Sequence, residues 1–423
     1  MTEPGPTATP TRSDGVRSRL YIACLVGMAV FAASLVTPAI CLREIRDEFH
    51  LSLAGGGLLG SLRTAALLPA LLLSGYLADR LGKSSFLTTG MLLVAAGLVG
   101  TSLAGRYGVL LATQAVAGMG AGVMEALVNP LVAELHAASP ARPLNVANGL
   151  FSVGLVVAAI VSGEMLQAHY AWRTTLWLWA PAACVGAALF ATRGYPDVSR
   201  RATKGGEGGD GGTAFLRKPL FWVLMGAMVL GGGCEAGMTF WGASFAEHEL
   251  GASARGGAWT VALFGAFMAL GRFTSGGLVS RVPPLGLMTG SAAGCAVATA
   301  GLCFVATVHG AWALFALGGL LVACLWPTIL AVAAEKVQVG SATMFALLAA
   351  AGISGCTAFP WCMGRIGDVA GLRAGAALLP CSMVVAAVLF LAAWRMTGGR
   401  ADRASEARGA RDGPPNGSAD HPM

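Results

Sequence analysis

Two long apolar runs, roughly 52–78 and 85–105, are separated by only a short charged turn. Each run is long enough for an α-helix to cross a bilayer, which takes about 20 apolar residues. A turn this short makes the two helices antiparallel neighbours. Its glycines permit close backbone approach, while its charged side chains stay in water. The residues singled out in this turn are Gly75, Asp79, Arg80, Gly82 and Lys83.

Similar runs recur along the whole chain. Of its 423 residues, 55% are hydrophobic and 12% are charged, whereas a soluble protein carries about 25% charged residues. The 60 glycines suit helices that pack closely in lipid. The sequence therefore predicts an all-α membrane protein with twelve transmembrane helices. The twelve runs lie at roughly 20–41, 52–78, 85–105, 107–134, 146–168, 172–193, 219–246, 257–280, 285–307, 311–335, 341–365 and 373–396.

The basic residues gather at one set of helix ends. With the N-terminus placed inside, the inner segments hold 20 of the 28 Lys and Arg residues and the outer ends hold 7. This asymmetry follows the positive-inside rule and predicts both termini in the cytoplasm. It also accounts for the net charge of +7 without nucleic-acid binding. We expect a monomeric, multi-pass protein of the plasma or inner membrane, whose partners are the lipid bilayer and a small-molecule substrate.

A Gly-rich, charged stretch between the sixth and seventh runs divides the chain into two halves. The halves align at an offset of 201 residues, because Gly75, Leu77 and Arg80 correspond to Gly276, Leu278 and Arg281. Such repeats place a substrate site between the halves near the midplane. The expected segments are a disordered N-terminus 1–19, a six-helix bundle 20–193, a cytoplasmic linker 194–218, a second bundle 219–396 and a disordered tail 397–423.

The pattern G-x-L-A-D-R-x-G-K at 75–83 resembles the signature loop of the major facilitator superfamily (MFS) of secondary transporters. The resemblance implies the MFS fold, with two pseudo-symmetric six-helix halves and no cofactor. Segments at 118–130, 233–241, 326–328 and 364–368 resemble the fucose/glucose-type sugar:proton symporters. Drug:proton antiporters typically carry an arginine where this chain has Gln114. Fucose permeases bear a carboxylate in helix 1, and this chain has none there.

Three charged residues are expected near the bilayer centre, where a charge costs roughly 2.5–3.5 kcal/mol on insertion scales. Glu125 shares a helical face with Gln114 and Asn129. It is expected to bind a coupling proton while Asn129 binds substrate; the alternative is a buried structural acid. Glu235 has the same two interpretations. Arg63 is expected either to pair with one of these acids or to bind an anionic substrate group.

Aromatic side chains provide further candidates for substrate contact. Trp241 and Trp326 lie in the segments that resemble sugar symporters, and either could stack on a sugar ring. The alternative for each is an ordinary packing role.

The charged turn is expected to act as a conformational gate. Asp79 would cap the N-terminus of helix 11 near Ser341. Arg80 would pair with Glu134, and the second copy of the turn would pair Arg281 with Glu335. Such contacts would exist only while the inner gate is closed, and so would set the balance between conformations.

These features predict a proton-coupled secondary active transporter of a small polar, sugar-like solute, working by alternating access. An exporter of a drug or less polar metabolite is the alternative within the same fold. A non-transporting membrane sensor or scaffold is the alternative of another class. The ten cysteines form no CxxC pair, and no metal or nucleophile constellation is found, so an enzyme is not expected.

Overall fold

A computed structural model describes residues 12–137, 141–191, 214–278, 282–337 and 342–409. Within these ranges every regular element is a helix. The first half contains α1 (Arg12–Ile40), α2 (Leu42–Phe49), α3 (Leu53–Leu81), α4 (Lys83–Leu103), α5 (Tyr107–Leu135), α6 (Ala141–Gln167), α7 (Trp172–Trp177) and α8 (Trp179–Phe190). The second half contains η2 (Ala214–Arg217), α9 (Pro219–Leu250), α10 (Ala254–Leu278), α11 (Pro284–Leu302), α12 (Val308–Val322), α13 (Leu325–Lys336), α14 (Ala342–Ala370), α15 (Leu372–Ala376) and α16 (Leu378–Gly409).

Eleven helical segments in the described ranges are long and apolar enough to span a membrane. The remaining expected crossing, at 172–193, is formed by α7 and α8, which are separated only at Leu178. Pro181 explains this break, because it has no N–H to donate to the carbonyl of Trp177. Pro327 and Pro380 similarly follow the breaks between α12 and α13 and between α15 and α16.

The two halves repeat the same helix arrangement. The starts of α3 and α10, at Leu53 and Ala254, differ by 201 residue numbers, as do those of α4 and α11 at Lys83 and Pro284. The start of α12 is likewise 201 residues after that of α5. The offset read from the sequence therefore corresponds to the helix boundaries themselves. It confirms the prediction of two pseudo-symmetric halves.

The halves meet tightly at one end of the bundle, which we call the closed end. There α3 approaches α14 so closely that a Cβ on Gly57 would lie 2.3 Å from the carbonyl oxygen of Pro360. Asp368 of α14 accepts hydrogen bonds from the backbone N–H groups of Leu53 and Ala54, at 2.6 and 3.1 Å. These groups begin α3, so the carboxylate caps a helix of the other half.

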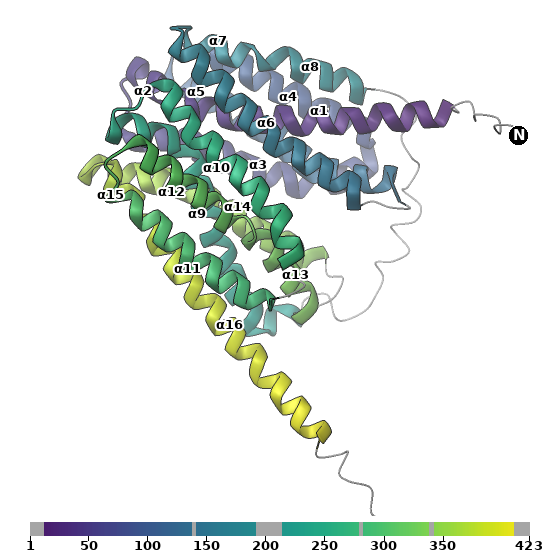
Figure 1. The fold of residues 1–423 in the computed structure, drawn as a ribbon. Helices are drawn as coiled ribbons and strands as arrows, with labels where there is room; N and C mark the ends of the chain where they lie inside the picture. Colours follow the sequence, from purple (N-terminus) through teal and green to yellow (C-terminus); the bar gives the residue numbers. More distant parts are fainter. Residues whose placement is uncertain (1–11, 138–140, 192–213, 279–281, 338–341, 410–423) are drawn as a thin grey trace, which may run out of the picture.

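The pairing of α6 with α10 repeats this contact on the other side of the bundle. A Cβ on Gly163 would lie 2.2 Å from the side chain of Ala258. Arg255 donates to Glu164 across 2.6 Å at the same end. Figure 1 places α2, α7 and α15 at this end.

The halves separate toward the opposite end, where α3 and α5 end and α9 begins. We call this the linker end, because α8 ends and η2 begins there (Figure 1). A cavity of about 810 Å³ opens between α6 and α10. Its walls carry Val153 and Phe273, with Arg142 and Asn145 on the same face of α6 nearer the linker end.

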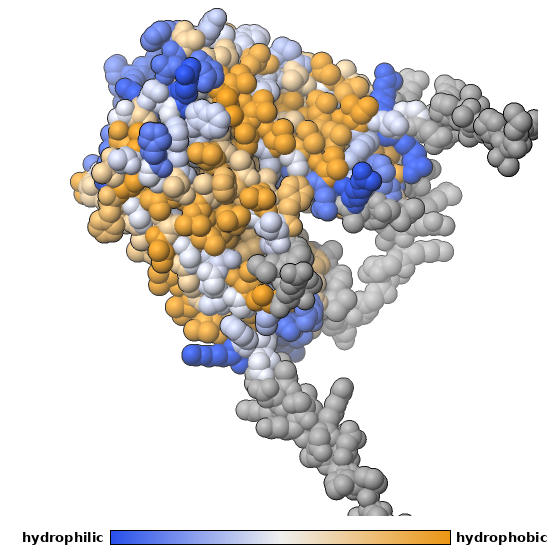
Figure 2. Space-filling view, in the orientation of Figure 1, coloured by the Kyte–Doolittle hydropathy of each residue, from blue (hydrophilic) through white to orange (hydrophobic). Residues whose placement is uncertain are grey.

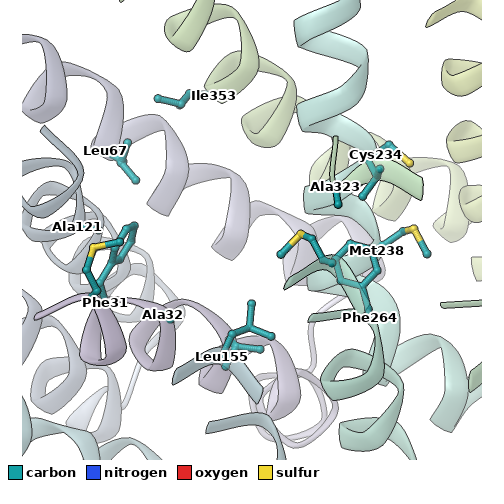
Figure 3. Packing of buried hydrophobic residues seen from close by; sticks show 14 of the residues in the cluster. Phe31, Ala32, Leu67, Ala121, Leu155, Cys234, Met238, Phe264, Ala323 and Ile353 are labelled. Atoms are coloured by element: carbon teal, nitrogen blue, oxygen red, sulfur yellow. The ribbon is translucent and has the colours of Figure 1, made fainter. Parts of the chain in front are cut away.

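Buried side chains fill the interior of each half, and hydrophobic residues cover much of the outside. Figure 3 shows Phe31 and Leu67 among the buried residues of the first half, and Met238 and Phe264 among those of the second. Figure 2 shows hydrophobic residues over the middle of the visible face and hydrophilic residues gathered toward its ends. This distribution is what a bilayer-spanning bundle requires.

The expected segment boundaries differ from the structure at both ends. Helix α1 already begins at Arg12, within the segment expected to be disordered, and α16 continues to Gly409, past its expected end near 396. The residues after 397 include several Ala, Arg and Glu, which favour helix and extend α16. Most of the predicted linker lies outside the described residues, and its last part forms η2.

Candidate functional site

Glu125 is exposed although it lies in the interior of α5, ten residue positions before the helix ends at Leu135. The charges that act on it come from Arg272 and Glu235, both in the other half. An exposed carboxyl surrounded by charges of the opposite half lies where the two halves face each other. The side chain of Glu125 is therefore open to the space between the halves, although the surrounding protein partly desolvates the carboxyl.

Arg272 forms the ion pair at this site. Its Nη2 donates to Oε1 of Glu235 across 3.2 Å, joining α10 to α9. Both side chains are partly buried. Sequence reasoning missed Arg272, because it was counted among the charges of an inner helix end. The sequence feature that could have identified Arg272 is its position inside an apolar run, six residues before the end of α10.

The expected pairing of Arg63 with Glu125 or Glu235 is wrong in this structure. Arg63 is 3% exposed, and its Nη2 donates to Oγ of Ser34 across 2.8 Å. Glu235 is held instead by Arg272. The physical reason is rotation about the helix axis: Arg63 faces α1 within its own half, whereas Glu235 faces α10.

The polar face of α5 is only partly open. Gln114 is 2% exposed and donates to Oγ1 of Thr101 on α4, so it does not line the interior between the halves. Gly118 and Gly122 pack against α3, where a Cβ would lie 2.0 and 2.3 Å from the carbonyl oxygens of Arg63 and Leu67. The open part of the face therefore begins at Glu125.

Asn129 lies one helical turn beyond Glu125 on the same face. Its Oδ1 accepts from Nδ2 of Asn148 on α6 at 3.1 Å. Asn148 is exposed and also donates to the carbonyl of Leu144. Asn148 is thus a polar neighbour of the site that sequence reasoning did not single out, and the two amides can offer donors and acceptors to a polar solute.

The two tryptophans differ in their surroundings. Trp241 is 1% exposed and its Nε1 donates to the carbonyl of Pro360 across 2.9 Å, so it packs α9 against α14. This placement contradicts the expectation that Trp241 stacks on substrate. Trp326 is partly buried and lines a narrow crevice together with Glu235. Of the two, only Trp326 lies at the charged site.

At the linker end the charged turn is built around Gly82. It is the single residue between α3 and α4, and its φ of +95° is strained for any residue with a side chain. Lys83, the next residue, forms an ion pair with Glu134 near the end of α5. The expected partner of Glu134 was Arg80, whereas the partner found is Lys83. Arg80 itself is exposed.

The remaining gate residues are only partly described. Gly75 and Asp79 lie in the last turns of α3, but the structure does not describe the side chain of Asp79, so the proposed cap on α14 falls outside the described residues. Arg281 falls outside them too. Glu335 pairs with its neighbour Lys336 at 3.0 Å. Among the described residues, no group of three or more His, Cys, Asp or Glu side chains could hold a metal ion.

Two related halves, closed at one end and parted at the other around a charged centre, form a bundle of membrane-spanning helices with the repeat arrangement found in many transporters. The family comparison agrees: the Major Facilitator Superfamily model matches residues 22–354. The chain belongs to the major facilitator superfamily. Its members carry small molecules across membranes, so the chain is a transporter and not an enzyme.

Solved structures show the same fold at low sequence identity. A bacterial homologue of the human lysosomal transporter Spinster, in an inward-facing and occupied conformation, is 16% identical with a TM-score of 0.73, covering 92% of this chain and 98% of that one. The nucleoside transporter NupG (D323A mutant) is 13% identical with a TM-score of 0.76, covering 90% and 100%.

A D-xylose-proton symporter is 15% identical with a TM-score of 0.73, covering 88% of this chain and 97% of that one. No curated protein sequence matches the chain. At these identities the likeness shows the fold alone.

Proposed function

We propose that the chain is a proton-coupled secondary active transporter of a small polar organic solute. It would lie in the cell membrane with its linker end facing the cytoplasm. The excess of basic residues at the linker end supports this orientation. With that orientation, the conformation described here is open toward the cytoplasm. A transport cycle would alternate it with a state in which the closed end opens.

The observation that carries the proposal is the exposed carboxyl of Glu125 beside the Arg272–Glu235 pair. Arg272 pairs with Glu235 and acts electrostatically on Glu125, and the two carboxylates repel each other whenever both are ionised. Adding one proton relieves that repulsion. Because the three side chains belong to both halves, their charge state can affect how the halves fit together.

A polar solute is supported by the groups next to this centre. Asn129 and Asn148 supply amide donors and acceptors, and Trp326 offers an aromatic face beside Glu235. The D-xylose-proton symporter and the nucleoside transporter are proteins of the same fold whose names state polar substrates. A sugar-like solute is therefore the favoured class.

An exporter of a less polar compound is the second candidate. It is favoured by the cavity between α6 and α10, whose walls include Val146, Val153, Val157 and Phe273. Apolar walls suit an apolar ligand. The two candidates differ in the direction of pH-driven flux and in the ligands that bind.

The test begins with a ligand screen. Purified protein is heated with sugars, sugar acids and amphipathic drugs, since a compound that binds the folded state raises the apparent melting temperature. The best ligand is then used for uptake into proteoliposomes with and without an imposed pH gradient. Glu125→Gln, which cannot release a proton, should bind the ligand and exchange it passively but lose pH-driven accumulation.

Glu164→Gln is the matched control, because Glu164 pairs with Arg255 at the closed end, away from the charged centre. It should accumulate ligand as the wild type does. Accumulation by Glu125→Gln at the wild-type level would make Glu125 a structural acid and move the coupling site to Glu235.

A further inference from the structure

The positive charge of Arg63 is buried in the first half, and no described residue forms an ion pair with it. Its side chain is 3% exposed. One nitrogen, Nη2, donates to Oγ of Ser34, and Nη1 has no hydrogen-bond partner. Ser34 is a neutral acceptor whose own hydroxyl donates to the carbonyl of Phe31 across 2.7 Å. Arg63 thus keeps most of its five N–H donors and its full charge unmatched.

Neither carboxylate of the charged centre pairs with Arg63. Glu235 is paired with Arg272, and the charges acting on Glu125 come from those same two residues. A buried charge without a partner is unfavourable and lowers the stability of the fold. Proteins keep such a group where function uses it, at a cost in stability. The group that neutralises Arg63 is therefore expected to be part of a ligand.

The position of Arg63 gives a ligand a route to it. Gly60 and Ser61, on the preceding turn of α3, touch the second half: the ring of Phe240 lies against Gly60, and the N–H of Trp361 donates to Oγ of Ser61 at 3.1 Å. When the closed end parts, these contacts are lost and the next turn of α3 is uncovered. Arg63 lies on that turn, and its side chain would meet a ligand entering from the closed end by turning away from Ser34 of α1.

The summed charge of the groups within the membrane-spanning helices also bears on the charge of a suitable ligand. Glu125, Glu235, Arg272 and Arg63 sum to zero when both acids are ionised. Uptake of one proton by either acid leaves a net charge of +1. An organic monoanion bound at the same time restores neutrality, which favours a closed, water-poor loaded state.

We infer that Arg63 binds the oxyanion of an organic carboxylate, and that this carboxylate is the solute carried together with the proton. Guanidinium suits the task because its planar donors match a carboxylate. The inference rests on the proposed function and narrows its substrate to a sugar acid or a similar small carboxylate. One proton and one monoanion move together, so transport carries no net charge.

The first experiment separates this role from a structural one without any ligand. If Arg63 is held for binding, Arg63→Gln should be at least as heat-stable as the wild type in ligand-free buffer. A structural arginine would instead make the variant melt several degrees lower. Arg255→Gln is the matched control, because it breaks a formed ion pair with Glu164 outside the site. A clear loss of stability confined to Arg63→Gln overturns the inference.

The second experiment uses matched pairs of carboxylate and neutral compounds: gluconate with glucose, galacturonate with galactose, and lactate with 1,2-propanediol. We expect only carboxylates to raise the melting temperature of the wild type and of Arg255→Gln. Arg63→Gln should bind them at least tenfold more weakly, with partial recovery in Arg63→Lys. Stabilisation by neutral compounds alone, or by no carboxylate at all, overturns the inference.

Uptake in proteoliposomes distinguishes this inference from the proposed function. Carboxylate uptake driven by a pH gradient should be unchanged when a membrane potential is imposed with valinomycin and potassium. Proton-driven uptake of a neutral sugar would keep the proposed function and overturn the role of Arg63. Carboxylate uptake that does not depend on the pH gradient would support Arg63 as the anion site and contradict proton coupling.

Discussion

Arg272 donates to Glu235 across 3.2 Å, and the same guanidinium acts on Glu125 from the other half of the molecule. One cation therefore serves two acids on opposite halves. We expect an ionised Glu125 to draw Arg272 away from Glu235, and a protonated Glu125 to leave the pair undisturbed. The charged centre would then have two arrangements that differ by one proton.

Removal of the Arg272 guanidinium should abolish proton coupling at the charged centre. In Arg272→Gln, Glu235 loses its ion-pair partner and the two acids repel each other without a nearby cation. We expect pH-driven accumulation to be lost, and stability to fall by about 1.5–3 kcal/mol from the lost charged hydrogen bond. The measurement is uptake as a function of pH together with thermal unfolding. Arg272→Lys should restore part of both, and a wild-type pH profile in Arg272→Gln would contradict the assignment.

The ion pair between Lys83 and Glu134 should stabilise the first half without acting as a gate. Both residues belong to that half, at the start of α4 and near the end of α5, so opening or closing the bundle need not break the pair. Lys83→Met should lower the free energy of unfolding by about 1–2 kcal/mol, because it leaves a partly buried carboxylate unpaired. The measurement is thermal or denaturant unfolding in detergent.

Lys336→Met is the control for this pair. Lys336 and Glu335 are adjacent and more exposed, so this substitution should change stability by less than about 0.5 kcal/mol. If Lys83→Met shifts the balance between conformations while leaving stability unchanged, the pair is a gate contact after all.

The general architecture could be predicted from sequence because lipid requires long apolar helices and permits few charges. The runs at 52–78 and 107–134 became α3 and α5 with boundaries close to those expected. The charge pairings could not be predicted in the same way. Arg63 and Glu235 are both charges within apolar runs, but which neighbour each one meets depends on helix rotation and on how the halves pack.

Residue spacing alone also could not distinguish an open helix face from a packed one. Gly118 and Gly122 share a face with Glu125, yet they are glycines because the backbone of α3 passes directly over them. A small residue gives the same sequence pattern whether it lines an open cavity or lets another helix pack closely. Similarly, Trp241 lies in a segment that resembles sugar symporters, but its indole is used to join α9 to α14.

Glu44 on α2 should make the closed end sensitive to pH. Burial raises the pKa of Glu44, an effect that Asp47 adds to and Arg43 opposes, and Oε2 of Glu44 has no hydrogen-bond partner. A raised pKa means that the folded state favours the protonated form. Its stabilising contribution is present below the ordinary carboxyl pKa of about 4.3 and is lost as pH rises through the raised value.

Thermal unfolding between pH 4 and 7.5 tests this sign. Glu44→Gln should lack the loss of stability that the wild type shows as pH rises. The melting temperature of the variant should therefore increase relative to that of the wild type with rising pH. Glu48, on the same helix, is the control of opposite sign: its hydrogen bond from Arg173 lowers its pKa, so its contribution is lost as pH falls. Parallel pH curves for the wild type and Glu44→Gln would contradict the prediction.

Gly57 should set how firmly the closed end stays shut. A Cβ at this position would lie 2.3 Å from the carbonyl oxygen of Pro360, a backbone atom that cannot move aside without moving α14. Gly57→Ala should therefore push α3 and α14 apart and favour the conformation that is open at this end. An overpacking cost of about 1–3 kcal/mol corresponds to a change of roughly 5–150-fold in the ratio of the two conformations.

Spin-label distances across the closed end measure this shift. Labels at Ser52 and Val369, both exposed, report the separation of α3 from α14 in a background with the ten cysteines replaced. Gly57→Ala should populate a longer distance that is rare in the wild type. Gly290→Ala, where a Cβ meets nothing within 4 Å, should leave the distribution unchanged. An unchanged distance in Gly57→Ala would mean that the α3–α14 contact adapts locally and does not control which end of the transporter is open.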